Sequence, residues 1–300
     1  MRAIPFVPVL AFSETYDALR SSRVHRLVTR DLVTVEGPGA FEWLQGQVSQ
    51  DLTGLAPGGA REALVLSPQG KLDAYCRVWR RSEELFHLEV EQGFGDLLTE
   101  RLRRFKVRVK ATLGQSTSQL LECRGPEALA SVGSGVAWEW AGFSGWDMLL
   151  EDDPLPEALP PEGDRLAFEV ARIEAGVPRM GAELTAKTIP QEAGDELLAR
   201  SVSFTKGCYT GQELVARIDA RGSNVARLLR GVVSAGPLCA GTGLSAGGGA
   251  VGTVTSAAES PRGGFVGLAM VRRGVELPAE VKVEGTDEEA EIRSLPLARG

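Results

Sequence analysis

A lysine and a cysteine stand two residues apart in the segment Lys206–Glu213, where the charge of one can act on the other. Thr210 followed by Glu213 fits a capping box, so we expect a helix to begin just after Cys208. A helix N-terminus carries roughly half a positive charge, and Lys206 adds a full one. Both effects favour a thiolate at Cys208 over a thiol. The segment predicts either a reactive cysteine or an inert, buried one in a glycine-rich connection.

The cysteines and histidines are too few and too scattered to form a local metal site. The chain has four cysteines without a Cys-x-x-Cys pair, and only two histidines: Cys76, Cys123, Cys208, Cys239, His25 and His87. Zinc and iron–sulfur sites usually take their ligands from closely spaced pairs. No such ligand set is written in this chain, and its sparse cysteines favour a reducing, cytoplasmic location.

The composition is that of a globular protein with room for two or three domains. Of its 300 residues, 43% are hydrophobic and 24% are charged, and the net charge is −7. This negative charge argues against nonspecific adhesion to nucleic acid or to an anionic membrane. No apolar run approaches the roughly 18 residues of a membrane-spanning helix. We therefore expect no membrane association.

The spacing of apolar residues predicts helices and strands in an α+β arrangement over the first 120 residues or so. Period-two and helical patterns indicate a helix near Ser13–Asp17, strands at Leu32–Val35, Ala63–Leu66, Leu72–Trp79, Phe86–Val90 and Val107–Leu113, and helices at Pro38–Gln47 and Phe94–Phe105. The strands on either side of Ser67–Gly70 form a hairpin, because Pro and Gly there are typical of a turn.

The rest of the chain changes from helical patterns to short strands. Leu166–Ile173 fits a helix or a strand, and Ile189–Leu198 opens as a helix. Five short strands then predict a small β-barrel or sandwich: Leu228–Val233, Val251–Thr255, Phe265–Val271, Val281–Val283 and Ala290–Arg293. The glycine-rich stretch Gly241–Gly252 lacks the lysine of a phosphate-binding loop, so we assign its glycines to turns.

Six cations crowd the stretch Arg101–Lys110, at the junction of a predicted helix and strand. Such a run is usually a solvated face, but it also fits a contact with phosphate, a polyglutamate tail or RNA. An RNA contact would use the aromatic side chains of Tyr75 and Trp79 for stacking.

Six segments together resemble the folate-binding YgfZ family, which is related to the glycine-cleavage T-protein, an aminomethyltransferase. They span nearly the whole chain, and Lys206–Glu213 is the most specific: Phe41–Asp51, Leu66–Lys71, Arg172–Pro178, Ile189–Glu192, Lys206–Glu213 and Gly252–Ser256.

The resemblance implies a three-lobed ring around a central tetrahydrofolate cavity. Residues 1–54 with 120–222 would form the first lobe, residues 55–119 an inserted ferredoxin-like α+β lobe, and residues 223–300 a C-terminal β-barrel. It also implies a tetrahydrofolate-binding accessory protein for the assembly, maintenance or repair of iron–sulfur enzymes, including enzymes that modify tRNA. Its expected partners are folate and those enzymes or their assembly proteins. A weak tRNA contact is expected from the basic run Arg101–Lys110 rather than from the resemblance.

The resemblance also suggests the site residues. Glu192 matches the T-protein carboxylate that holds the pterin, and a carboxylate suits the pterin's N–H groups; its ordinary explanation is a helix N-terminus. Arg217 would either pair with Glu213 or clamp the glutamate tail of the folate. Tyr209, Asp51 and Lys71 complete the expected folate set, although the last two also fit ordinary turns. Lys206 and Cys208 are the expected reactive pair.

Two other functions remain open, and so does whether the chain is an enzyme. A folate-dependent aminomethyl or methyl transferase would use Glu192 and Asp96 as acid or base. However, the T-protein's Asn-Ala run before its catalytic aspartate is missing here, and helix N-capping explains Asp96. The second alternative is a tRNA-binding module built on Arg101–Lys110.

Overall fold

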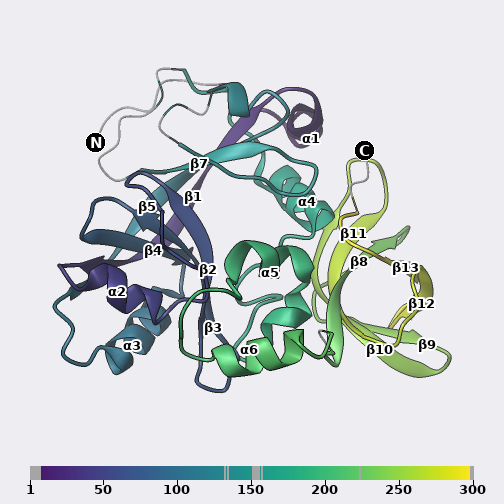
Figure 1. Cartoon of the computed structure of the whole chain (residues 1–300). Coiled ribbons are helices and arrows are strands. Elements are labelled where there is room, and N and C mark those ends of the chain that lie inside the picture. The colour runs from purple at the N-terminus through teal and green to yellow at the C-terminus, as the bar shows by residue number, and fades with distance from the viewer. Residues whose placement is uncertain are drawn as a thin grey trace. The chain divides into compact units, whose positions relative to one another are not determined.

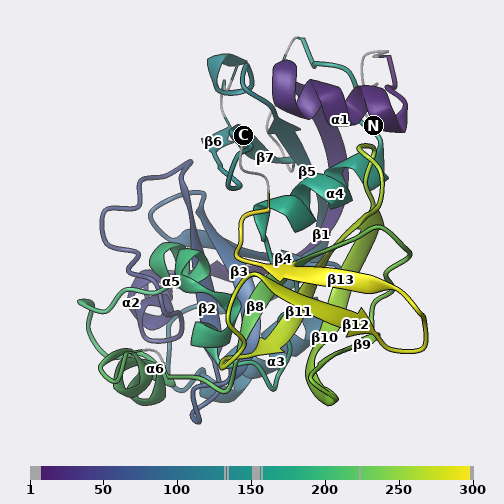
Figure 2. The same cartoon turned by 90° about the vertical axis from the view of Figure 1, so that its right-hand side faces the viewer.

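The structure, a computed structural model, describes residues 8–131, 133, 135–150, 156, 158–222 and 224–297. The chain divides into two compact units. Unit 1 comprises Met1–Val28, Gln119–Pro178 and Arg227–Gly300, and unit 2 comprises Thr29–Ser118 and Arg179–Ala226. Figures 1 and 2 label the elements of both units along the colour ramp of the chain.

Unit 2 combines an antiparallel sheet with five short helices. Within it the strands run in the order β2-β3-β4-β1, and β1 and β5 each continue into unit 1. The elements are β1 (Val24–Glu36), α2 (Ala40–Gln45), β2 (Ala60–Leu66), β3 (Leu72–Arg80), β4 (Leu85–Glu91), α3 (Gly95–Phe105), β5 (Thr112–Arg124), the 3₁₀ helix η2 (Pro190–Ala193), α5 (Asp195–Ser201) and α6 (Gln212–Asp219).

Two apolar clusters hold unit 2 together. One lies between the sheet and helices α2 and α3, where Val33, Trp43, Phe86 and Leu98 are buried. The other joins the ends of β2 and β3 to α5 and α6, with Leu66 and Val215 fully buried. Burying such side chains contributes roughly 1.5–3 kcal/mol each. Helices α5 and α6 therefore pack at the end of the sheet that carries the β2–β3 hairpin turn.

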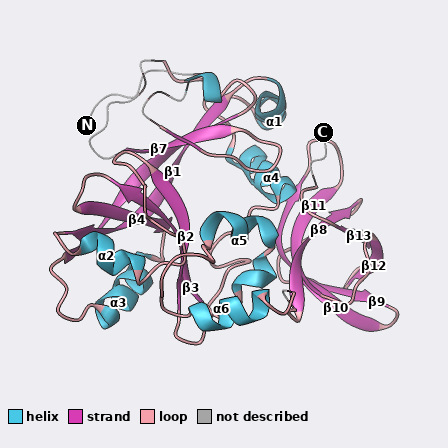
Figure 3. Cartoon of the chain, in the orientation of Figure 1, coloured by secondary structure: helices cyan, strands magenta, loops and turns pink. Residues whose placement is uncertain are grey.

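Unit 1 joins helices α1 and α4 to a closed β-barrel. The barrel order is β10-β11-β8-β13-β12-β9, and Figure 3 shows its strands in magenta. The elements are α1 (Phe12–Ser21), the 3₁₀ helix η1 (Leu129–Ser131), β6 (Val136–Ala137), β7 (Gly145–Leu150), α4 (Arg165–Ala175), β8 (Arg227–Ser234), β9 (Gly243–Ala246), β10 (Gly249–Glu259), β11 (Phe265–Arg272), β12 (Ala279–Val283) and β13 (Glu289–Arg293).

Helix α4 begins and ends with standard caps. The Asp164 carboxylate accepts hydrogen bonds from the backbone N–H groups of Leu166 and Ala167, at 2.8 and 3.2 Å. Gly176 ends the helix with a φ of 74°, which glycine adopts without steric cost. The helix packs against α1 and against barrel strands β10 and β11.

The α+β class and the C-terminal β-barrel predicted from the sequence are confirmed. Leu166–Ile173 is helical, and Phe94–Phe105 is helix α3 from Gly95 onward. The three-lobed division and the central cavity stay predictions. Among the described helices, none is long and apolar enough to cross a membrane.

Three local predictions were wrong. The strand expected at Val107–Leu113 starts only at Thr112, because Arg108 takes a left-handed φ of 56° that a strand cannot contain. The single helix expected at Ile189–Leu198 is split in two by Gly194, whose φ is 99°. Two glycines of the stretch Gly241–Gly252, which we assigned to turns, begin strands instead: Gly243 begins β9 and Gly249 begins β10.

Candidate functional site

The ammonium group of Lys206 is the centre of a hydrogen-bonded hub in unit 2. Its Nζ donates to the backbone oxygens of Gln45, Val48 and Gln50 at 2.8, 2.9 and 2.8 Å. It also lies 3.2 Å from Oε1 of Gln45. An ammonium has three N–H donors, so these four oxygens use its full capacity. Lys206 thus ties the Lys206–Glu213 segment to the end of Phe41–Asp51.

Gln45 and Asp51 extend this hub. Gln45 accepts from the Leu52 N–H at 2.8 Å and donates to Oδ1 of Asp51, also at 2.8 Å. Asp51 Oδ1 accepts from the Thr53 N–H as well, and these hydrogen bonds, with a smaller contribution from Lys206, lower the pKa of Asp51. Burial lowers the pKa of Lys206 to about 8, partly offset by Asp51. Asp51 therefore has two roles. It accepts a hydrogen bond within the turn that follows it, and its negative charge acts on the ammonium of Lys206.

Cys208 is exposed, two residues beyond this hub. The capping box predicted at Thr210 and Glu213 is wrong: helix α6 starts at Gln212, and its N-cap is Gly211, which has no side chain to form such a bond. The Lys206 ammonium donates to backbone oxygens of the 45–50 loop. Its effect on the Cys208 thiol stays a prediction. Among the described residues, no group of three or more His, Cys, Asp or Glu side chains could hold a metal ion.

Two glycines bring the Leu66–Lys71 turn against the start of α6. A Cβ on Gly211, whose φ is 83°, would lie 2.5 Å from the Ser67 carbonyl oxygen. A Cβ on Gly70 would lie 2.6 Å from Cβ of Leu214. In addition, the Thr210 N–H donates to the Gly46 carbonyl at 3.1 Å. Three of the six segments that carry the family resemblance therefore meet in one place.

Tyr209 is buried beside the hub, with 9% of its surface exposed. Its backbone N–H donates to Oε1 of Gln212 at 3.0 Å, and the Lys206 Nζ lies 5.4 Å from the centre of its ring. Burial raises the pKa of the Tyr209 hydroxyl to about 12. The Gln212 side chain thus ties the first residue of α6 to the backbone three residues earlier.

Glu192 is 4% exposed, and its Oε2 accepts from the Ile189 N–H at 3.0 Å. This supports the ordinary explanation for one of its oxygens, because a carboxylate at a helix start accepts from a backbone donor. Gln191 was not predicted. Its Nε2 donates to the Val215 carbonyl of α6 at 2.9 Å, and its Oε1 is buried without a hydrogen-bond partner.

Lys71 and Arg217 do not join the hub. Both side chains are exposed. Lys71 closes the hairpin turn through its backbone, whose N–H donates to Oγ of Ser67 at 3.2 Å. Within the described part of the chain, Arg217 forms no ion pair with Glu213, so the paired alternative is wrong. The other alternative for Arg217, a contact with a ligand, stays a prediction.

The remaining two resembling segments meet in unit 1. The buried guanidinium of Arg172 donates to the Val177 carbonyl at 2.6 Å and to Oγ of Ser256 at 2.8 Å. A bulge between Val254 and Ser256 interrupts the pairing of β10 with β11 just before this contact. A bulge changes the direction of the side chains that follow it. This explains why the side chain of Ser256, on a barrel strand, contacts Arg172 of α4.

The aromatic platform expected for RNA is wrong. Trp79 is 2% exposed and donates to Glu89, and the Tyr75 hydroxyl donates to buried Glu62. Arg101 is also buried: it pairs with Asp73 at 2.9 Å and donates to the Leu66 carbonyl at 2.8 Å. Arg101 therefore positions the hairpin turn. The sequence did not predict this role, because Arg101 stands in a run of cations that is usually exposed to solvent.

Asp31 has the capping role that was predicted for Asp96. Its Oδ2 accepts from the N–H groups of Gly93 and Gly95 at 2.8 and 3.0 Å, at the start of α3. Asp96 is exposed and accepts from the Gln115 side chain at 2.8 Å. The sequence holds no signal for this cap, because Asp31 lies 64 residues from the helix start.

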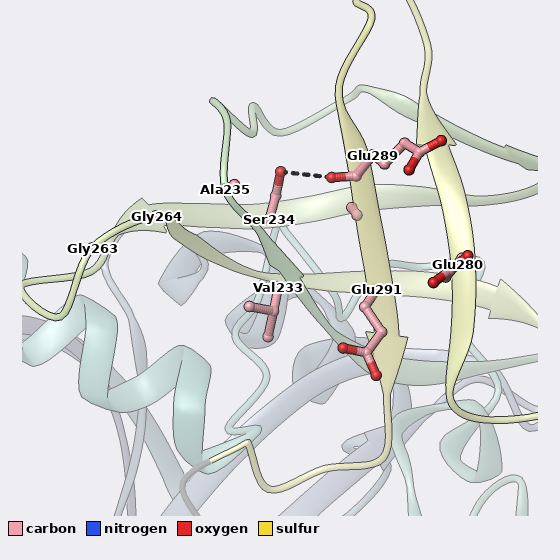
Figure 4. Close-up of a pocket in the computed structure, with 9 residues that line it drawn as sticks. Val233, Ser234, Ala235, Gly263, Gly264, Glu280, Glu289 and Glu291 are labelled. Atoms are coloured by element: carbon pink, nitrogen blue, oxygen red, sulfur yellow. Dashed lines mark hydrogen bonds between the residues drawn. The ribbon is translucent and has the colours of Figure 1, made fainter.

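A hollow of about 520 Å³ lies on the barrel in unit 1 (Figure 4). The side chains of Glu280, Glu289 and Glu291 surround it, and the Ser234 hydroxyl donates to the Glu289 carbonyl at 3.3 Å. Three carboxylates make this face unfavourable for an anionic ligand.

Several proteins similar to this chain carry a name that states a function. The chain is 31% identical to the tRNA-modifying protein YgfZ of Photorhabdus laumondii, over 71% of this chain and 72% of that protein. The tRNA-modifying protein YgfZ of Pectobacterium atrosepticum is 29% identical over 74% and 72%, and an uncharacterized protein of Haemophilus influenzae is 31% identical over 66% and 69%. No protein-family model matches the chain.

A solved structure shares the fold. The glycine cleavage system aminomethyltransferase T of Bartonella henselae superimposes with a TM-score of 0.73 over 95% of this chain and 88% of that one. Sequence identity is 20%, so this similarity concerns the fold alone. Together with the 31% identity over 72% of a YgfZ protein, it shows that the chain belongs to the YgfZ family, whose fold is related to that of aminomethyltransferase T.

Proposed function

We propose that this chain is a tetrahydrofolate-binding accessory protein for the assembly, maintenance or repair of iron–sulfur enzymes, including enzymes that modify tRNA. The observation that carries the proposal is that Cys208 is exposed. It lies two residues after Lys206, whose ammonium donates hydrogen bonds to the backbone of the 45–50 loop. The name of the YgfZ relatives supports the connection with tRNA modification. A cytoplasmic location belongs to the same proposal, and all four cysteines are free thiols.

The residues of Ile189–Glu192 fit the pterin end of a folate. A pterin presents N–H donors along one edge, and these need acceptors. Glu192 is a buried carboxylate held by the Ile189 N–H, and the neighbouring Gln191 has a buried acceptor oxygen without a partner. A buried acceptor left unsatisfied costs about 1–3 kcal/mol, which a donor-rich ligand would recover. Glu192 is thus the proposed pterin ligand, and Gln191 its neighbour.

Arg217, Lys71, Asp51 and Tyr209 form the outer part of the proposed folate set. Arg217 and Lys71 are exposed cations without a partner in the described structure, which suits the carboxylates of the folate tail. Asp51 and Tyr209 act on the site indirectly, because both are used in holding the Lys206 hub. When bound, a folate would supply its one-carbon chemistry and a polar surface beside the protein.

Cys208 is proposed to ligate the iron of a transferred cluster. Ligation itself displaces the thiol proton to solvent, so it requires no thiolate formed beforehand. One exposed cysteine supplies one ligand, and the partner protein or a small thiol supplies the others. The role of Lys206 in this proposal is to hold the segment in a fixed conformation from which Cys208 projects.

Calorimetric titration with tetrahydrofolate tests the ligand. Glu192→Gln keeps the shape and removes the charge, so we expect binding to weaken about tenfold or more, as for lost charge-assisted hydrogen bonds. Glu196→Gln, on an exposed residue of α5, is the matched control. Equal affinity in both variants would exclude Glu192 as the pterin ligand.

The role of Cys208 is tested in cells that lack their own copy of the protein. Cys208→Ser should fail to restore the activity of an iron–sulfur enzyme that modifies tRNA, whereas Cys239→Ser, the other exposed cysteine, should restore it. Full restoration by Cys208→Ser would remove the cysteine from the proposal.

A further inference from the structure

Five cations of unit 2 form a basic surface where α3 ends and β5 has not yet begun. We define it by Arg103, Arg104, Lys106, Arg108 and Lys110. Four of the five side chains are exposed, and that of Lys106 is half-buried. All five charges lie within eight residues of the sequence. Lys106 Nζ donates to the Val109 carbonyl at 3.4 Å.

No carboxylate of the described residues pairs with the exposed members of this surface. Elsewhere in unit 2, the buried or half-buried arginines Arg77, Arg101 and Arg200 all have acidic partners. The net charge of −7 acts at longer range, and salt screens it beyond roughly 8 Å under physiological conditions. A polyanion close to the basic surface would thus experience mainly its local positive charge.

The surface borders a hollow of about 620 Å³. The hollow is lined by Pro38, Gly39, Glu42, Trp43, Arg108, Val109 and Lys110. This volume lies within the range of small-ligand pockets, roughly 300–1,000 Å³, and is large enough for a nucleotide. The lining has an apolar wall and two cations, with Glu42 as its single carboxylate.

The backbone around the hollow is held in place. The Gly39 N–H donates to the Lys110 carbonyl at 3.1 Å, and a Cβ on Gly37 would lie 2.5 Å from that same oxygen. Arg108 has a φ of 56°, the only positive φ of a non-glycine residue in the described chain. Left-handed backbone is uncommon for such a residue, and it places a cation where glycine would be favoured.

We propose that this basic surface binds the phosphodiester backbone of RNA, with one nucleotide entering the hollow beside Trp43. RNA fits better than a lipid surface, because a bilayer is flat and cannot enter a concave site. The inference rests on the proposed function, in which the partner enzymes act on tRNA. It also replaces the interpretation that used Tyr75 and Trp79, since neither is available for stacking.

Fluorescence anisotropy with labelled bulk bacterial tRNA tests the proposal. Arg103→Gln, Arg104→Gln and Arg108→Gln combined should weaken binding at least tenfold. The slope of log affinity against log salt should become flatter by about 2, because each lost phosphate contact removes roughly 0.7. The matched control is Arg165→Gln, Arg221→Gln and Arg272→Gln, which removes the same charge from three other exposed sites. An equal loss of tRNA affinity in both triple variants would show that binding depends on net charge and not on this surface, and would overturn the proposal.

Footprinting on the wild-type protein keeps the test valid if the triple variant misfolds. Bound tRNA should protect Lys106 and Lys110 from acetylation and leave exposed Lys282 on the barrel unprotected. Vesicles with anionic phospholipid and polyglutamylated folate serve as competitors. If either competitor, but not tRNA, produces the protection, the surface serves that ligand and the RNA proposal fails.

The outcomes separate this proposal from the proposed function. The triple variant should bind tetrahydrofolate like wild type, because none of its residues belongs to the Ile189–Glu192 segment. Loss of tRNA binding with folate binding intact supports the basic surface. Absence of tRNA binding to wild-type protein at low salt would overturn it and leave the folate proposal unaffected.

Discussion

Gly70 and Gly211 pack so closely that neither position has room for a side chain. A Cβ on Gly70 would lie 3.1 Å from the Gly211 carbonyl oxygen, and a Cβ on Gly211 would lie 3.3 Å from the Gly70 Cα. Both residues have positive φ, at 72° and 83°. This contact joins the β2–β3 hairpin turn to the start of α6, and so sets where the Lys206–Glu213 segment begins its helix.

Gly211→Ala should destabilise unit 2 by about 2–5 kcal/mol. A left-handed conformation costs an alanine about 1–2 kcal/mol, and the clash with Ser67 adds an overpacking cost of about 1–3 kcal/mol. Gly54→Ala is the control: Gly54 has a φ of 73°, and a Cβ there would meet nothing within 4 Å, so this variant should show only the first cost. Urea unfolding measures both. Equal costs would show that the contact with the turn is unimportant.

Lys206→Met should destabilise the protein by about 2–5 kcal/mol, because it leaves the three backbone carbonyls of the 45–50 loop without their donor. Lys71→Met, on the exposed lysine of the hairpin turn, should change stability by less than about 0.5 kcal/mol. If Lys206→Met instead kept full stability and slowed only the alkylation of Cys208, the lysine would act on the thiol, as the sequence suggested.

The hub should also give unfolding a distinct pH dependence. Burial lowers the pKa of Lys206 to about 8 from 10.5, so between these values the unfolded chain binds more protons than the folded one. The free energy of unfolding of wild type, relative to Lys206→Met, should therefore rise between about pH 8 and about pH 10.5. Tyr209, whose pKa is raised to about 12, is present in both proteins, so its titration largely cancels in this difference. A difference that stays constant with pH would contradict the lowered pKa.

Iodoacetamide should alkylate Cys208 and Cys239 in the native protein and leave Cys76 and Cys123 unmodified. The first two are exposed, whereas burial raises the pKa of Cys76, and that of Cys123 to about 12. A thiol that is buried and protonated reacts slowly. Peptide mass spectrometry identifies the modified sites, and urea-unfolded protein, in which all four should react, is the control. Rapid native labelling of Cys76 would show that unit 2 opens locally.

The sequence located the parts of the candidate site more accurately than their roles. Phe41–Asp51, Leu66–Lys71 and Lys206–Glu213 do come together. In addition, Lys206 holds the 45–50 loop, and Asp51 is used by that loop. These hydrogen bonds could not be predicted from the sequence, because the partners of Lys206 lie 156 to 161 residues away in the chain.

The sequence by itself determined the α+β class and most helices and strands, because burial along one element leaves a period that local spacing records. For the C-terminal strands the spacing left a barrel or a sandwich open, and the family resemblance implied the barrel. Tertiary structure alone decided that Arg101 is buried with Asp73 while its neighbours stay exposed, and that Asp31 caps α3. Such pairings satisfy buried polar groups with partners distant in the chain. No periodicity within a single segment carries that information.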